Sequence, residues 1–591
     1  MVNFFDVLGI GAFAPQTALL KFTRQTEDKL IPGTMNVANT IPVLLQAFIF
    51  ITIIEVDPLT LILMLVSATV GAVIGAGIFS TIGQAAYQGG PGISLLFVIT
   101  AITCGFSALC YAEFASRVPL AGSAYTYSYV VFGELVAWII GWALILEYAI
   151  GNIVVAISWS GYFNNLLVHL LHIELPSWML VDPVTASSAY EQALVALSNP
   201  STLSATQLDT FRFAKEAYES APRIGHTHFF FNLPAFIIVA LVTYLAYIGI
   251  KESKRGTNIM VLFKVGVILF VIGAGAFYVD TNNWTPFMPN GITGVLKGVS
   301  AVFYAYIGFD AISTMAEECK NPQKDMPRGM INSLLICTGL YIAIALVLTG
   351  MEHYTLFEGV TDPLAFVFEK RAPWIEKIVS VSAVVATTSV LIVFQIGQPR
   401  IWMSMSRDGL LPTKFQSLNK YQTPGFATII TGLIVGLGAL FLQGGLVTDL
   451  TSIGTLFAFV LVSGGVLLLP RIDKKPGQFK LPDWSGRYWI PVLLLIFVYI
   501  NTGRIEAAFQ SIQSGSSEGL LLLLFFLISL LIAIFTAIKN LAFIPVMGVL
   551  SCLYLLVEIP LSSWKWFFVW MAVGLLIYFS YGQKNSKLKA D

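Results

Sequence analysis

Residues 71–79 read Gly-Ala-Val-Ile-Gly-Ala-Gly-Ile-Phe, so three glycines stand within seven positions of an apolar run. Each glycine weakens a helix by about 1 kcal/mol relative to alanine. A second apolar run, residues 303–310 (Phe-Tyr-Ala-Tyr-Ile-Gly-Phe-Asp), carries one glycine beside an aspartate. Paired interruptions predict two broken membrane helices that face one cavity, with breaks at Gly75 to Gly77 and at Ile307 to Gly308. For the first run, the alternative is close helix packing of the GxxxG type.

The composition is that of an integral membrane protein. Of the 591 residues, 56% are apolar and 11% are charged, whereas soluble domains carry about 25% charged residues. A net charge of zero gives no basic field for nucleic acid. Apolar runs long enough for a bilayer core of about 30 Å recur along the chain. They predict an all-α fold with fourteen spans, near residues 59–82, 93–115, 130–168, 232–250, 258–279, 295–316, 330–350, 376–403, 425–442, 447–470, 488–502, 519–538, 541–557 and 565–582.

The distribution of charge decides how the long stretch 130–168 is interpreted. Taken as one helix, it leaves most loop lysines and arginines on one side of the membrane, as the positive-inside rule requires. Splitting it into two helices would reverse every later loop. We therefore expect one long helix, a multi-pass protein of the cell membrane, and a cytoplasmic C-terminal tail.

The chain is expected to have four parts. Residues 1–56 form an N-terminal extension with an extra apolar segment at 41–54, residues 57–470 form a core of ten helices, residues 471–582 add four helices, and residues 583–591 form the tail. Within the core, residues 173–229 are polar and are expected as a small extracellular helical insertion.

The two breaks offer complementary chemistry to a zwitterion. A half-helix that begins after a break points free N–H groups and a positive dipole end into the cavity, which suits a carboxylate. A half-helix that ends before a break offers carbonyl oxygens, which suit an ammonium group. We expect a substrate carboxylate on the amides of Ala76 and Gly77. The segments expected to bind the substrate backbone contain Val73, Ile74, Gly75, Ala76, Gly77, Tyr304, Ala305 and Ile307, of which the carbonyls of Val73, Tyr304, Ala305 and Ile307 would hold the α-amino group.

Three ionisable residues lie inside apolar runs, namely Glu147, Lys264 and Asp310. A charge at mid-bilayer costs about 2.5–3.5 kcal/mol even on insertion scales, so each is a functional candidate, with snorkelling to the interface as the alternative. A lysine in a dry site can load and lose a proton near neutral pH. We expect Lys264 to be the coupling group, in the place where a sodium-driven relative would hold its ion. Hydroxyl oxygens for that spot would come from Thr387, Thr388 and Ser389.

Other kinds of chemistry lack a sequence signal. The five cysteines form no CxxC pair, and no P-loop is present, so nothing points to ATP-driven transport. The histidines, at positions 169, 172, 226, 228 and 353, lie in or near expected external segments; His226 and His228 could share a metal, but a solvated pair is the preferred interpretation. We expect no enzyme activity, no cofactor and no metal.

From Gly71 onward the sequence carries motifs of a known superfamily. They are the run 71–79, Gly89-Gly90-Pro91-Gly92, Tyr111-Ala112-Glu113-Phe114, Gly122-Ser123-Ala124-Tyr125, Gly141-Trp142, Leu146-Glu147-Tyr148, the run 303–310, Glu317-Glu318-Cys319-Lys320-Asn321-Pro322, Arg400, and Asp408-Gly409-Leu410-Leu411-Pro412. In these motifs the chain resembles the amino acid–polyamine–organocation superfamily, specifically its cationic amino acid transporter branch. The resemblance implies a LeuT-like core of five-plus-five inverted repeats with discontinuous helices 1 and 6, followed by four helices. It also implies proton coupling at Lys264, a gate at Phe309, and side-chain selection at Glu147, with Asp310 beside the second break.

Residues 1–70 are instead similar to a sulfite-exporter-like permease, through residues 6–15 and 30–37. The leading hypothesis is a proton-coupled amino-acid transporter, with cationic substrates as one expectation. An amino-acid exchanger and a neutral amino-acid permease remain alternatives. Two further alternatives are an anion permease and a nutrient sensor that binds its ligand without transporting it. The expected partners are an amino acid, protons and the lipid bilayer.

Overall fold

The computed structural model describes most of the chain from residue 76 onward. The described residues are 76–117, 125, 128–129, 132–198, 212, 214–225, 227–249, 254–308, 322–360, 362–468, 480–482, 484–514 and 519–587. The chain divides into two compact units, Met1–Met64 and Leu65–Asp591. All described residues belong to the second unit, so the expected apolar segment 41–54 lies outside them.

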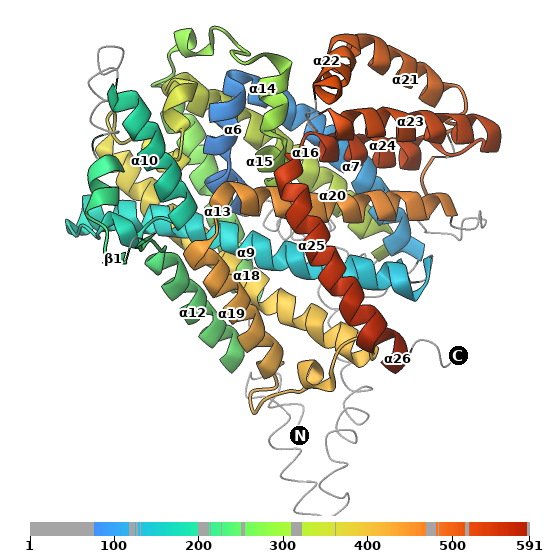
Figure 1. Cartoon of the computed structure of the whole chain (residues 1–591), viewed down its shortest axis with the longest axis horizontal. Helices are drawn as coiled ribbons and strands as arrows, with labels where there is room; N and C mark the ends of the chain where they lie inside the picture. Colours follow the sequence, from blue (N-terminus) through green and yellow to red (C-terminus); the bar gives the residue numbers. More distant parts are fainter. Residues whose placement is uncertain are drawn as a thin grey trace, which may run out of the picture. The chain divides into compact units, whose positions relative to one another are not determined.

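Helices dominate the described part, and the runs expected to span the membrane from 93 onward each coincide with one or more of them (Figure 1). The long helices are α7 (Ile93–Arg117), α9 (Glu134–Leu171), α12 (Leu233–Ile248), α13 (Lys254–Ala276), α16 (Pro322–Met351), α18 (Pro373–Arg407), α19 (Gly425–Phe441), α20 (Gly444–Leu468), α21 (Trp489–Ile500), α23 (Leu520–Lys539), α24 (Phe543–Val557) and α25 (Leu561–Ile577). Where the sequence predicted broken helices, the structure has short ones. These are α5 (Ala76–Ser80), α6 (Ile82–Gly89), α14 (Gly291–Lys297) and α15 (Val299–Tyr304).

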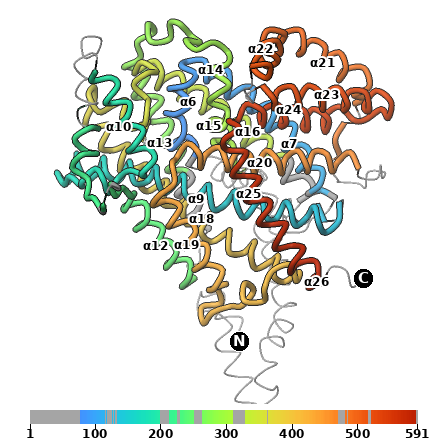
Figure 2. The backbone as a smooth tube through the Cα atoms, in the orientation of Figure 1, coloured from blue at the N-terminus to red at the C-terminus, as the bar shows by residue number. Residues whose placement is uncertain are grey.

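The stretch 130–168, expected as one helix, coincides with most of α9, which runs unbroken from Glu134 to Leu171 (Figure 2). Its antiparallel partner α18 forms the most extensive helix–helix interface with it among the described elements. Two ends of this bundle can be defined. At the lid end, α9 ends and α18 begins; at the tail end, α9 begins and α18 ends.

Short elements cover the lid end. They are α10 (Pro183–Ser198), a two-stranded antiparallel ribbon of β1 (Arg223–Ile224) and β2 (Thr227–His228), η4 (Thr281–Trp284), η6 (Tyr354–Phe357) and α17 (Pro363–Phe366). The insertion has its own small core, in which Tyr190 stacks on Tyr218 with ring centroids 4.2 Å apart and Phe230 is buried against the same ring. The short ribbon is the only β-structure besides one isolated bridge in the described part.

One helix near the C-terminus was not expected. After Ile500 the chain bends by 68° into α22 (Thr502–Gln513), which is mostly polar. Arg504 fixes this helix by donating from one guanidinium nitrogen to both carboxylate oxygens of Glu558, at 2.8 Å each. The chain then continues through α23, α24 and α25 to a π-helical turn (Tyr578–Gly582) and α26 (Gln583–Asn585).

By length and composition, seven helices of the described residues could cross a membrane, or eight if α21 and α22 form one bent span. Four shorter apolar helices accompany them, including α12 and α19. Many leucine, isoleucine and phenylalanine side chains remain exposed on α19, α21, α23 and α25. Such a surface suits lipid rather than water, so the chain is a multi-pass membrane protein.

Candidate functional site

The two interrupted segments meet in space. A methyl group in place of the Gly77 hydrogen would lie 2.3 Å from the Cα of Ala305 and 2.9 Å from the carbonyl oxygen of Tyr304. Only glycine allows α5 to approach the end of α15 this closely. The glycine-rich first run is therefore used for backbone contact with the second run.

Thr81, which the sequence did not single out, strengthens this junction. Its hydroxyl lies 2.7 Å from the carbonyl oxygen of Ala301 on α15 and 3.0 Å from that of Gly77. Thr81 itself is buried. A carbonyl inside an apolar bundle needs a donor, so Thr81 ties the two broken segments to each other.

The second break begins earlier than the sequence suggested. The helix α15 ends at Tyr304, and the amides of Ala305, Tyr306 and Ile307 bond to carbonyls three residues back, at 2.9–3.3 Å. Gly308 then takes a φ of 116°, which side-chain-bearing residues rarely adopt. The break thus includes residues 305–308, and Phe309 and Asp310 lie outside the described residues.

On the first segment, the described residues begin at Ala76. Val73, Ile74 and Gly75 lie outside them, and α5 is described from Ala76 onward. The amides of Ala76 and Gly77 therefore belong to its first described turn. Just beyond, Phe79 offers its carbonyl oxygen to the hydroxyl of Tyr162 on α9, at 2.9 Å.

Glu147 lies on the wall of α9 that faces this junction. Its side chain is 3% exposed. One turn further along α9, the carbonyl of Gly151 accepts a hydrogen bond of 2.8 Å from the hydroxyl of Tyr304. A methyl group at Gly454 of α20 would lie 3.9 Å from the Cβ of Glu147. Glu147 is therefore enclosed by α9 and α20, close to the end of α15.

Lys264 is buried on α13, with 5% of its surface exposed. The helix α13 packs against α16 and α18, and α18 carries the three hydroxyl residues that the sequence grouped with Lys264. Thr387 donates to the carbonyl of Ala383 at 2.6 Å. Thr388 donates to its own helix and accepts 2.8 Å from the indole of Trp159, so its hydroxyl faces α9.

A polar seam that the sequence did not predict runs along α9 and α18. Asn152 donates to the amide oxygen of Gln395, which in turn donates to Thr243 of α12 at 2.8 Å. Asn152, Thr243 and Gln395 lie far apart from one another in the sequence. Towards the lid end, the seam continues through Trp159 and Thr388 to a cluster around His169. Among the described residues, no group of three or more His, Cys, Asp or Glu side chains could hold a metal ion.

Comparison with known proteins identifies the class to which these features belong. A family model described as "Amino acid permease" matches residues 59–516, and one for the "C-terminus of AA_permease" matches residues 541–586. The chain therefore belongs to the amino acid permease family, within the amino acid–polyamine–organocation superfamily. The match begins before Gly71, so it includes residues 59–70, which the sequence grouped with the N-terminal stretch.

Several curated proteins are similar over most of their length. The branched-chain amino acid permease BcaP of Bacillus subtilis (strain 168) is 38% identical over 523 residues, which are 88% of this chain and 92% of the relative. The methylthioribose transporter of the same organism is 34% identical, with the same two shares. The vacuolar cationic amino acid transporter 2 of Arabidopsis thaliana is 31% identical, covering 89% of each chain.

Proposed function

We propose that this chain is a secondary active amino-acid transporter that works by alternating access in a cell membrane, with its C-terminus cytoplasmic. The observation that carries the proposal is the contact of Gly77 with the backbone of Ala305, because it brings two interrupted helices together inside a membrane bundle. A fold of five-plus-five inverted repeats would account for this pairing.

The site would hold the parts that all amino acids share. The amides of Ala76 and Gly77 would bind the carboxylate, and the carbonyls of Ala305 and Ile307 would bind the α-amino group. The carbonyl of Tyr304 already accepts the Ile307 amide at 3.3 Å, so only its second lone pair would serve the substrate. Asp310 and Phe309 would complete the site from the far side of the break.

We assign to Glu147 the selection of substrates by their side chains. A buried carboxylate favours cationic side chains, and the plant relative is a cationic amino acid transporter. The higher identity to BcaP favours branched-chain side chains. We keep both as candidates, with exchange of amino acids as the alternative to net uptake.

Proton coupling is assigned to Lys264, which is buried on α13, a helix that packs against α18. Replacing it with alanine removes the group that would load and lose the proton. We expect uptake by Lys264→Ala to lose its dependence on pH. Uptake measured at several pH values tests this, and the wild-type pH profile in the variant would refute the assignment.

The deciding experiment uses the purified chain in proteoliposomes, with and without an inward proton gradient. Uptake of labelled leucine, arginine and alanine is compared with uptake of sulfite. Amino-acid uptake that the gradient stimulates is the expected result. Sulfite flux alone would favour an anion permease, and amino-acid binding without flux would favour a sensor; either outcome would overturn the proposal.

A further inference from the structure

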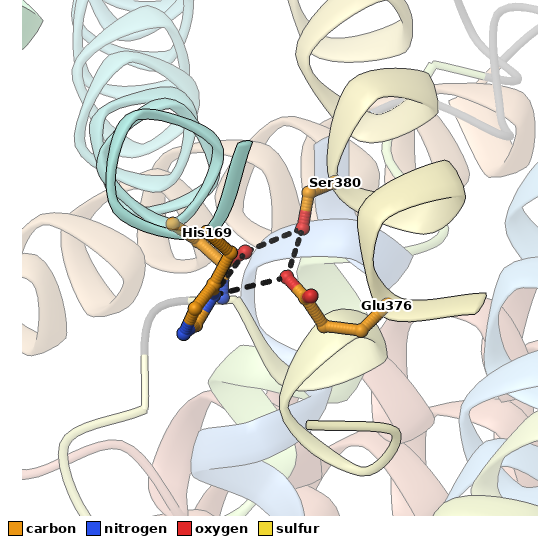
Figure 3. A network of polar contacts seen from close by, with 4 residues as sticks. His169, Glu376 and Ser380 are labelled. Atoms are coloured by element: carbon orange, nitrogen blue, oxygen red, sulfur yellow. Dashed lines mark hydrogen bonds and ion pairs between the residues drawn. The ribbon is translucent and has the colours of Figure 1, made fainter. Parts of the chain in front are cut away.

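The lid end of the bundle holds a cluster of polar side chains that the amino-acid site does not use (Figure 3). His169 on α9 faces Glu376 on α18, with Nδ1 3.3 Å from Oε1. The hydroxyl of Ser380 lies 3.2 Å from the same carboxylate oxygen and 2.8 Å from the amide oxygen of Asn165. Glu376 is 1% exposed. The contacts with His169 and Ser380 therefore replace the hydrogen bonds that its carboxylate would make with water.

Asn165 extends this cluster to a third element. Its side chain is hydrogen-bonded to the carboxyl of Asp362, the residue that immediately precedes α17. Its amide oxygen meanwhile lies within reach of Ser380 and, at 3.4 Å, of His169. One amide therefore connects α9 and α18 to the loop that carries α17.

The helix α17 packs against α5, the first described helix of the first broken segment. The amide of Leu364 points at the hydroxyl of Tyr162, at 3.4 Å, and that hydroxyl donates to Phe79 of α5. A methyl group at Gly83 of α6 would lie 3.1 Å from Pro363 and 3.3 Å from the carbonyl oxygen of Val360. The loop before α17 therefore packs directly against α6.

We propose that Asn165, His169, Asp362 and Glu376 form a proton-responsive clasp that holds α17 down over α5 when the lid end is acidic. The clasp is separate from Lys264, which lies on another helix. That it gates a substrate rests on the proposed function, whereas the clasp itself does not depend on what the chain carries.

The direction of the response follows from the charges. Burial, with smaller contributions from the charges of Glu369 and Glu376, raises the pKa of the Asp362 carboxyl to about 6 against hydrogen bonds that lower it. In water an aspartate has a pKa of about 3.9. The clasped form thus binds the proton more tightly, so it gains stability as pH falls through about 6 and loses it as pH rises.

The histidine acts in the same direction. The ion pair between His169 and Glu376 exists only when the imidazole is protonated, so acid favours this contact as well. The other charged groups nearby are already engaged or exposed. They are Glu358 beside Tyr87, Glu369, Lys370, and Arg371, which pairs with Glu352 at 3.2 Å.

A cysteine at a buried position of α17 can report whether the clasp is closed. Ala365 on α17 is fully buried, so Ala365→Cys should react with a maleimide only when α17 lifts. Thiol reactivity itself rises with pH, so each rate is divided by that of Ser220→Cys, which is exposed. The unmodified chain gives the background, since its four described cysteines are buried.

We expect the normalised labelling rate of purified protein to fall about two- to fourfold between pH 7.5 and 5.5, because a carboxyl with a pKa of about 6 goes from ionised to mostly protonated over this interval, whereas one near 3.9 stays ionised. In Asp362→Asn the carboxyl is permanently neutral, so the rate should stay low at both pH values. His169→Gln should keep only part of the response. Glu191→Gln, an exposed acid on α10, is the matched control and should behave as wild type.

Labelling requires no transport, so it separates the clasp from the proposed function. A response retained in Lys264→Ala would show that the two proton sites are distinct. Equal pH dependence in the wild type, Asp362→Asn and His169→Gln would overturn the clasp, and so would faster normalised labelling in acid. If Asp362→Asn does not elute as one peak, His169→Gln decides the outcome alone.

Discussion

At the scale of single residues, glycine decides where the two broken segments can meet. Gly77 is the clearest case, because any side chain there would collide with main-chain atoms of residues 304 and 305. Main chain cannot rotate away as a side-chain tip can. By contrast, a methyl group at Gly266 of α13 would meet nothing within 4 Å.

We expect Gly77→Ala to lower uptake at least about tenfold, because overpacking by one methyl costs about 1–3 kcal/mol and must move α5 away from α15. Proteoliposome uptake at equal protein amounts measures the effect. Gly266→Ala is the control and should keep wild-type uptake, with slightly higher stability from better helix propensity. Equal uptake by both variants would mean that the junction tolerates a side chain.

At the scale of elements, the sequence predicted the helices whose length follows from the thickness of the bilayer. It did not predict the features that depend on contacts between residues far apart in the chain. The long helices follow apolar runs, since about 20 residues are needed to cross. The polar α22 has no such run. The end of α15 at Tyr304 depends on a tightened turn, and the pairing of His169 with Glu376 joins residues 207 positions apart (376 minus 169).

The α9–α18 seam explains how two long helices keep their register. Its hydrogen-bonding positions on α9 include 152 and 159, and those on α18 include 395 and 388, so both sets are seven residues apart. Such spacing keeps one face of each helix towards its partner. Polar bonds at these positions fix which turn of α9 meets which turn of α18.

Gln395→Leu should therefore destabilise the bundle by about 1–3 kcal/mol, since it leaves the buried amide of Asn152 without its acceptor. Replacing both residues by leucine should cost less than the sum of the two single changes, because no orphaned amide remains. Thermal unfolding in detergent measures all three variants. Gln510→Leu, on the exposed face of α22, is the control and should unfold with the wild type. Additive losses would contradict the coupling of the pair.

At the scale of the whole second unit, the last helix is built into the core. Trp142 of α9 and Trp570 of α25 stack with centroids 4.6 Å apart, and each indole donates to the other residue's carbonyl, at 2.9 and 3.1 Å. Beyond α25, the amide of Lys587 donates to the carbonyl of Asp408 at 3.0 Å. Lys587, the last described residue, thus contacts the residue that directly follows α18.

Gly574 tests whether this attachment matters, because a methyl group there would lie 2.3 Å from the indole of Trp142. That indole cannot yield, since Trp138 stacks on it and Trp402 meets it edge-on. We expect Gly574→Ala to separate α25 from α9, lower the unfolding temperature, and speed proteolytic cleavage after residue 577. Gly464→Ala, whose methyl would meet only Val549 at 3.9 Å, should change neither. Faster cleavage with unchanged uptake would mean that α25 only stabilises the fold. Faster cleavage together with reduced uptake would make α25 part of the transport machinery. Unchanged cleavage would refute the attachment of α25 to α9.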